Sequence, residues 1–167
     1  LKLKLKTADE RKYFAWLGIF QKQKNLQGLL KIANTLPDVM FHIAGEPANK
    51  IDVATKDALD KLKKCRNVKF VGFLNRTEIY SFLGGAKALI NTSFYEGFSN
   101  TFLESFETGT PIITTSRVDP DNIISKNNLG LVGNNNNEIP ELISKLINYK
   151  SYDQLSKKCR DYVMNNH

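Results

Sequence analysis

The sequence lacks the features that mark several classes of protein. It has two cysteines in 167 residues, Cys65 and Cys159, which stand far apart with no Cys-x-x-Cys pair or neighbouring histidine. This excludes a disulfide scaffold and the common zinc sites, and it predicts a reducing, cytoplasmic setting. His42 and His167 have no partner at metal-ligand spacing, so we expect no metal site. No apolar run approaches the roughly 20 residues that cross a bilayer.

The N-terminus lacks both an initiator methionine and a secretory signal. It reads Leu-Lys-Leu-Lys-Leu-Lys, without a long apolar stretch or a small-residue cleavage site. We therefore expect a domain excised from a longer protein, with residues 1–11 forming a linker or a hinge strand.

The charge is uneven but scattered. The formal net charge is +7, from 24 Lys and Arg against 17 Asp and Glu. Such a balance favours anionic partners, namely nucleic acid, an acidic membrane surface or phosphorylated small molecules. No basic stripe interleaved with aromatic residues is present, so we expect no nucleic-acid partner.

Short apolar runs alternate with helical patterns along most of the chain. This alternation predicts one α/β domain over residues 1–167, a three-layer Rossmann-like fold with a parallel sheet of about six strands and helices on both faces. Strands are expected at residues 13–18, 39–44, 68–71, 88–90, 111–114 and 130–132, and helices from residue 25, at 52–63, from 75 or 77 to 85, at 100–108, at 139–147 and, within a terminal segment 149–167, at 152–164. Residues 116–128 are expected to be an irregular connection, and residues 133–137 a surface loop.

The loop after the fourth strand, residues 91–104, has the most unusual composition. In an open parallel sheet, ligands bind at the carboxyl ends of the strands, close to helix N-termini. Gly97 allows a positive φ or a close approach of the backbone to a ligand, and Ser99 and Asn100 are good N-cap types for the next helix. Free amides at that N-terminus would suit a phosphate.

Helical geometry gathers Phe102, Leu103 and Phe106 on one face of this helix and turns Glu104 away from it. Two purely structural interpretations stay open. Thr101-x-x-Glu104 fits a capping box, and Glu96 could be a solvated loop acid. On spacing alone these structural interpretations are favoured.

The loop after the first strand, residues 18–25, is basic. Gly18 ends the strand, and Lys22 and Lys24 approach the start of the next helix. A lysine beside a helix N-terminus opposes the dipole unless an anion lies between them. This indicates an anionic ligand or, equally, a solvated basic loop. The loop matches neither the Walker pattern nor the Gly-x-Gly-x-x-Gly fingerprint.

One longer segment resembles a known family. Residues 93–113 read Ser-Phe-Tyr-Glu-Gly-Phe-Ser-Asn-Thr-Phe-Leu-Glu-Ser-Phe-Glu-Thr-Gly-Thr-Pro-Ile-Ile, which is similar to the Glu-x7-Glu region of the group 1 (family 4) glycosyltransferases. Residues 16–25, 36–45 and 68–74 look like three further strands and loops of that family, so the resemblance covers roughly residues 12–148. It implies the C-terminal, donor-binding half of a retaining, metal-independent enzyme of the GT-B fold.

The resemblance also implies a role for each site residue. Glu104 would bind the ribose hydroxyls of the donor, Glu96 would contact the transferred sugar, and Lys24 would neutralise the departing diphosphate. Lys24 and Glu96 are thus the expected catalytic residues. The donor would also meet Gly18, the backbone amides of Gly97, Phe98, Ser99 and Asn100, and the side chain of Thr101, and its base would rest near residues 72–75.

The implied function is transfer of a sugar from a nucleoside-diphosphate sugar to a glycan or lipid-linked acceptor, without a cofactor. The N-terminal acceptor domain of such an enzyme is absent from these 167 residues, so we expect the isolated chain to be inactive. The positive charge is compatible with peripheral contact at the cytoplasmic face of a membrane. The alternatives are a GT-B sugar-nucleotide epimerase and a flavodoxin-like nucleotide-binding module, the latter disfavoured by the basic first loop.

One position departs from the family pattern. The family usually has arginine directly after the first-strand glycine, and this chain has Ile19 there. The diphosphate would lose a bidentate donor, for which Lys22 could substitute only as a point charge.

Overall fold

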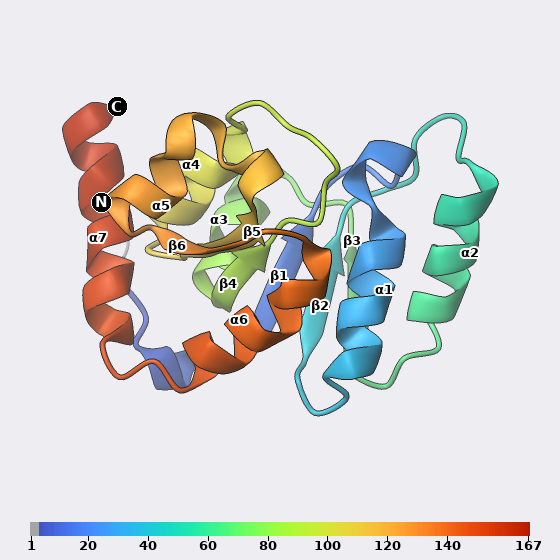
Figure 1. Cartoon of the computed structure of the whole chain (residues 1–167), viewed down its shortest axis with the longest axis horizontal. Helices are drawn as coiled ribbons and strands as arrows, with labels where there is room; N and C mark the ends of the chain where they lie inside the picture. The colour runs from blue at the N-terminus through green and yellow to red at the C-terminus, as the bar shows by residue number, and fades with distance from the viewer. Residues whose placement is uncertain (1–3) are drawn as a thin grey trace.

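The computed structural model describes residues 4–167 as one parallel six-stranded sheet with helices on both faces (Figure 1). The strand order is β3-β2-β1-β4-β5-β6, from β1 (Tyr13–Leu17), β2 (Phe41–Ala44), β3 (Val68–Gly72), β4 (Ala86–Ile90), β5 (Ile112–Thr115) and β6 (Gly130–Gly133). The helices are α1 (Leu26–Thr35), α2 (Val53–Leu62), α3 (Arg76–Gly84), α4 (Asn100–Glu107), α5 (Ile123–Asn127), α6 (Ile139–Ile147) and α7 (Tyr152–Asn166). The predicted Rossmann-like fold is confirmed.

Two groups of helices enclose the sheet. Helix α1 packs against α2 and α6, whereas α4 packs against α3 and α7. The middle strands are therefore buried on both sides, and β4 and β5 are made almost wholly of buried residues. This explains why their sequences are continuously apolar rather than alternating.

The segment between β5 and β6 differs from the expected irregular connection. It contains two 3-10 turns and α5, and the Asp119 carboxylate caps α5 by accepting from Ile124 N at 2.7 Å and Ser125 N at 3.1 Å. Asp121 and Asn122 both have positive φ just before the helix. A five-residue helix is too short to show a hydrophobic period, so the sequence pattern missed it.

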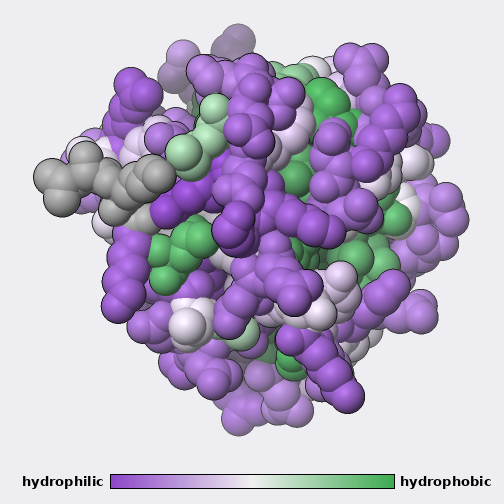
Figure 2. Space-filling view, turned by 90° about the vertical axis from the view of Figure 1, so that its left-hand side faces the viewer, coloured by the Kyte–Doolittle hydropathy of each residue, from purple (hydrophilic) through white to green (hydrophobic). Residues whose placement is uncertain are grey.

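The N-terminal segment contains no strand between residues 4 and 12, only a 3-10 turn at Ala8–Glu10. Residues 1–3, part of the expected linker or hinge strand, lie outside the described residues. The face that α7 and this segment form is mainly hydrophilic, with separate apolar patches (Figure 2). No helix within residues 4–167 is long and apolar enough to cross a bilayer.

A buried arginine holds the N-terminal segment against the amino ends of the strands. Arg11 is 2% exposed and lies below the ring of Tyr152, 5.7 Å from its centroid. Its guanidinium donates to five neutral oxygens, Lys6 O (3.2 Å), Ala86 O (2.9 Å), Thr110 Oγ1 (2.7 Å), Thr108 O (3.1 Å) and Ser156 Oγ (3.3 Å). One side chain thus links the start of the chain to β4, to the turn before β5 and to α7.

Replacing Arg11 should be strongly destabilising. In Arg11→Met the apolar stem is kept, but the buried oxygens lose their donor, which should cost more than about 3 kcal/mol of unfolding free energy. The midpoint of thermal unfolding should fall by roughly 10 °C. The exposed Arg66→Met serves as the control and should change the unfolding free energy by less than about 0.5 kcal/mol. Equal effects of the two substitutions would contradict the proposed role of Arg11.

Candidate functional site

The two loops singled out in the sequence meet at the carboxyl edge of the sheet. They follow β1 and β4, which pair in parallel with Phe14 opposite Ala88 and Ala15 opposite Leu89. Three hydrogen bonds connect the loops: Phe94 N to Gln23 O (2.9 Å), Gln23 Nε2 to Tyr95 O (2.8 Å) and Thr92 Oγ1 to Lys24 O (2.8 Å). A fourth, from Trp16 Nε1 to Thr92 Oγ1 (3.1 Å), joins β1 to the second loop. The two loops therefore form one structural unit.

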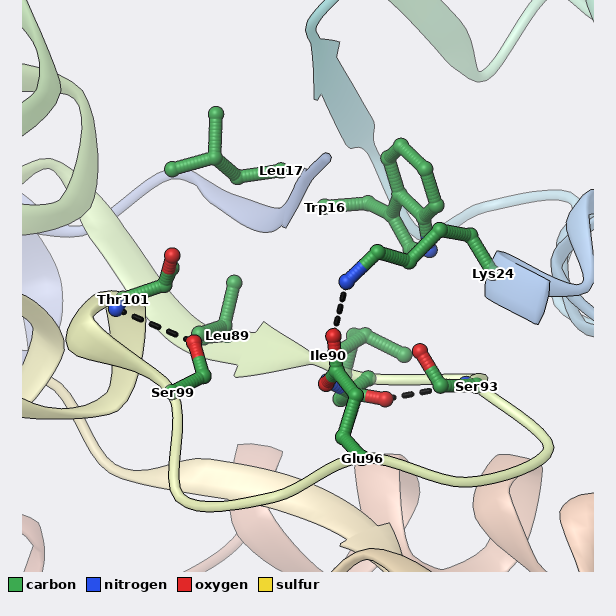
Figure 3. A pocket seen from close by; sticks show the side chains of 10 residues that line it. Trp16, Leu17, Lys24, Leu89, Ile90, Ser93, Glu96, Ser99 and Thr101 are labelled. Atoms are coloured by element: carbon green, nitrogen blue, oxygen red, sulfur yellow. Dashed lines mark hydrogen bonds and ion pairs between the residues drawn. The ribbon is translucent and has the colours of Figure 1, made fainter. Parts of the chain in front are cut away.

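An ion pair lies at the centre of this unit. The Lys24 ammonium donates to Glu96 Oε1 (Figure 3). Asn91 Nδ2 donates to Glu96 Oε2 at 2.5 Å. The side chains of Lys24 and Glu96 are 20% and 8% exposed. Glu96 is therefore not a solvated loop acid. Burial lowers the pKa of Lys24, while the adjacent carboxylate favours its charged form.

The ion pair occupies most of the small cavity in which it lies. Trp16, Leu89 and Ile90 form its apolar part, and Ser99 and Thr101 face it from the start of α4. The remaining space is about 20 Å³, room for about one water molecule. A larger anion could enter only if Lys24 or the loop moved.

The N-terminus of α4 borders this cavity. Ser99 is the N-cap, and its Oγ accepts from Thr101 N at 3.0 Å. Thr101 is already inside the helix, so the capping-box alternative for Thr101 and Glu104 is wrong, because the helix begins two residues before the position that the box requires. Asn100, the other candidate cap, is the first residue of the helix and is exposed.

Gly97 and Phe98 connect the ion pair to α4. Gly97 is exposed and does not have a positive φ, so the first of its two expected uses is not observed. A close approach of its backbone to a ligand stays a prediction, and a Cβ at Gly97 would meet only open space. Phe98 packs edge-on against Phe102 at 5.9 Å and stacks on His167 at 6.4 Å. Its side chain is thus directed toward α7, and only its backbone is available to the cavity.

The side chain of Lys24 packs over Gly18 on its way to Glu96. A Cβ on Gly18 would lie 3.5 Å from both Cδ and Cε of Lys24, so the lysine stem passes directly over this glycine. Gly45, at the end of β2, has φ +135°, and a Cβ there would lie 1.8 Å from Gly18 O. A side chain at Gly45 would push the first loop away from the site, whereas a Cβ at Gly18 would make ordinary contact with Lys24.

Glu104 lies in a separate, wider groove between the β3–α3 loop and α4. The groove has a volume of about 790 Å³, and its wall includes Phe73, Asn75, Arg76 and Leu103. Burial raises the pKa of Glu104, and the charge of Arg76 partly offsets this. Glu104 points away from the buried Phe face as expected. Leu103 does not belong to that face, because it is only half-buried and borders the groove.

Position 19, where the family usually has arginine, holds an apolar side chain, and Lys22 does not take over the expected role. Ile19 is 51% exposed. Lys22 is exposed near Asp52, whose pKa is lowered first by the Thr55 hydroxyl and to a smaller extent by Lys22. Lys22 does not border the cavity of the ion pair.

Sequence reasoning missed Asn91, Thr92 and Gln23. Asn91 follows β4 directly at the carboxyl edge of the sheet, which was a usable signal. Gln23 and Thr92 act through backbone atoms of the opposite loop, which no spacing rule could reveal. No group of three or more His, Cys, Asp or Glu residues within 4–167 is placed to hold a metal ion.

The model of the family described as "Glycosyl transferases group 1" matches residues 2–165. This chain belongs to that family. Glycogen synthase from two strains of Mycobacterium tuberculosis is 33% identical over 94 residues, which are 54% of this chain and 22% of the synthase. The match with this chain therefore covers about a fifth of the length of these curated relatives.

Solved structures share the fold of this group 1 domain. A TarM mutant from S. aureus, crystallised with fondaparinux, alpha-GlcNAc-glycerol and UDP, has a TM-score of 0.75 at 23% identity over 98% of this chain and 35% of its own. The C-terminal domain of LpcC from Francisella tularensis has a TM-score of 0.75 at 22% identity, and the match covers 93% of this chain and 86% of the LpcC domain. Anabaena HepE in complex with UDP and glucose has a TM-score of 0.80 at 14% identity, and the match covers 95% of this chain and 45% of HepE. The chain thus has the architecture of a GT-B C-terminal domain.

The raised pKa of Glu104 predicts how pH affects stability. A carboxyl with a raised pKa disfavours the folded state when ionised, and this penalty disappears as the pH falls through the folded pKa to below its ordinary value of 4.5. Glu104→Gln should therefore be at least as stable as the parent at pH 7, with the difference shrinking toward pH 4. Urea unfolding across this range measures it. A loss of about 1 kcal/mol at neutral pH, as for a removed cap, would contradict this assignment.

Proposed function

We propose that this group 1 domain binds the donor in a retaining glycosyltransferase that transfers a sugar from a nucleoside-diphosphate sugar to a glycan or lipid-linked acceptor. The observation that carries the proposal is the placement of Lys24 and Glu96 together at the N-terminus of α4. This arrangement offers a cation and helix amides to phosphates, and a carboxylate to sugar hydroxyls, at one point of the sheet edge.

The diphosphate would lie between Lys24 and the first amides of α4. These are the amides of Ser99 and Asn100, because the Thr101 amide already donates to Ser99 Oγ. The dipole of α4 favours negative charge there. When the bond between the sugar and the diphosphate breaks, charge develops on the departing oxygen. A donor aimed at that charge is worth on the order of 3 kcal/mol. Lys24 would be this donor, and no metal or other cofactor takes part in the proposal.

The rest of the donor would extend from the cavity into the groove. Glu96 would accept from sugar hydroxyls, and Glu104 would accept from the two ribose hydroxyls, for which a carboxylate has enough lone pairs. The base would lie near Phe73 and Asn75, which share the groove with Glu104. UDP is present in the TarM and HepE structures, which supports a uridine nucleotide as the first donor to try.

The acceptor would be held by a further domain, as the short coverage of TarM and glycogen synthase suggests. The +7 charge is suited to an anionic membrane surface, so we place the reaction in the cytoplasm beside the inner face of a membrane. By itself this chain should bind a nucleoside diphosphate weakly and transfer no sugar.

Calorimetry with UDP, GDP and ADP tests the proposal. We expect one nucleotide to bind in the micromolar to millimolar range. Lys24→Ala and Glu104→Gln should each weaken its affinity about tenfold, as for the loss of one charged hydrogen bond. The thermal stability of the Glu104 variant should change little. The control is Glu141→Gln on α6, which touches neither cavity nor groove and should leave affinity unchanged. Absence of binding by all three nucleotides at millimolar concentration would refute the proposal.

A further inference from the structure

The two carboxylate oxygens of Glu96 are held by partners of different kinds. Oε1 accepts from the ammonium of Lys24, and Oε2 accepts from the side-chain amide of Asn91 at 2.5 Å. One partner is a charge on a long flexible stem, and the other is a short neutral side chain. The two contacts should therefore respond differently to a ligand that carries negative charge.

Asn91 is fixed on every side. Its N donates to Ile113 O at 3.0 Å, and its O accepts from Thr114 Oγ1 at 3.1 Å, so β5 holds its backbone. Its Oδ1 accepts from Ser93 N at 2.9 Å. Because Ser93 N can only donate, the amide of Asn91 cannot be flipped, and its Nδ2 must face Glu96.

Lys24 is the exchangeable partner. Its ammonium ends a stem that passes over Gly18, and it is more exposed than Glu96, at 20% against 8%. A diphosphate at the start of α4 would offer this ammonium more negative charge than one carboxylate does. If Lys24 moved to the phosphate and Glu96 had no other partner, a nearly buried carboxylate would remain uncompensated, which is strongly unfavourable.

We propose that Asn91 is the positioning residue that keeps Glu96 in the cavity when a diphosphate draws Lys24 away, and that Oε1, thereby freed, selects the sugar. The inference rests on the proposed function. It makes sugar recognition conditional on diphosphate binding, because Oε1 is occupied by Lys24 until a phosphate removes it. Asn91 itself need touch neither the phosphate nor the sugar.

A substitution of Asn91 can separate its two contacts. Asn91→Asp keeps an oxygen for Ser93 N but replaces the donor to Glu96 with a second acceptor. In the double variant Asn91→Asp with Glu96→Gln, the amide donor and the carboxylate acceptor exchange places. The hydrogen bond between positions 91 and 96 is restored, and the pair again carries a single negative charge, as in the parent. Without ligand, the double variant should melt about 4 °C above Asn91→Asp, the shift expected for one charged hydrogen bond in a chain of this size.

A double-mutant cycle of these melting temperatures tests the contact itself. If the two losses simply add, Asn91 does not hold Glu96 and the inference fails. Should Asn91→Asp not fold, the side-chain amide resonance of Asn91 in the parent chain gives the same information. It should move strongly on Glu96→Gln, and an unmoved resonance would overturn the inference.

The second arm measures discrimination between a nucleotide with and without its sugar. Calorimetry gives the affinity ratio for UDP-glucose over UDP, for UDP-N-acetylglucosamine over UDP and for GDP-mannose over GDP. The added charge of Asn91→Asp acts on the phosphates of both members of a pair, so the ratio isolates the sugar. We expect the ratio of the best pair to fall about tenfold in Asn91→Asp, the effect of one charged hydrogen bond.

Asn134→Asp is the matched control. Asn134 Nδ2 donates to Glu138 Oε1 at 3.2 Å in the exposed loop after β6, so this contact joins the same two residue types outside the site. The affinity ratio of nucleotide sugar over nucleotide in Asn134→Asp should equal that of the parent. If nucleotides bind and Asn91→Asp leaves the ratio unchanged, this inference alone fails. If the parent chain binds no nucleotide, the proposed function fails with it, while the cycle without ligand still reports on the contact.

Discussion

The parallel pairing of β1 with β4 is the constraint on which the site depends. It places two strand ends side by side at the centre of the sheet, although the loops that follow them are 72 residues apart in sequence at Lys24 and Glu96. The crossover through α1, β2, α2, β3 and α3 separates these loops along the chain and returns the second to the first. Hydrogen bonds from the side chains of Gln23 and Thr92 to backbone carbonyls of the opposite loop then fix the distance between the loops.

The site balances its own charge in the absence of a ligand. Lys24 and Glu96 are both largely removed from water, and a buried charge is tolerated only with a partner. Their ion pair satisfies this requirement, and it also leaves little free volume. Under the proposed function, binding of an anion would exchange one partner of Lys24 for another. The same exchange would couple recognition of the phosphates to recognition of the sugar.

The two ends of the sheet have different tasks. At the amino ends, Arg11 is a buried cation whose acceptors are neutral oxygens, and it connects the first residues of the domain to α7. At the carboxyl ends, Lys24 is a largely buried cation with an ionised partner, which the ligand would replace under the proposed function. The Arg11 arrangement suits a structural role because every N–H group of its guanidinium is used in a hydrogen bond. The Lys24 arrangement suits the proposed binding role because one ionised partner can be exchanged for another.

The fold was determined by the sequence itself to a large extent. Each predicted strand and helix is observed, since continuous apolar strands between amphipathic helices permit few other arrangements. Helix α5 was missed because it is held by the side chain of Asp119, which accepts from its first amides. Such a contact leaves no hydrophobic periodicity in the sequence. Gly18, Lys24, Glu96 and Glu104 were identified from residue type and family resemblance, with their positions near helix N-termini following from the order of elements.

Only the tertiary structure decided how those residues meet. The sequence Thr101-x-x-Glu104 fits a capping box, yet the N-cap is Ser99 and the helix starts at Asn100, because cap geometry depends on how the preceding loop enters the helix. The sequence could not reveal that Lys24 and Glu96 neutralise each other, or that Asn91 holds the second oxygen. Local patterns determine elements over a few residues, whereas an ion pair between distant loops depends on the register and spacing of the strands that carry them.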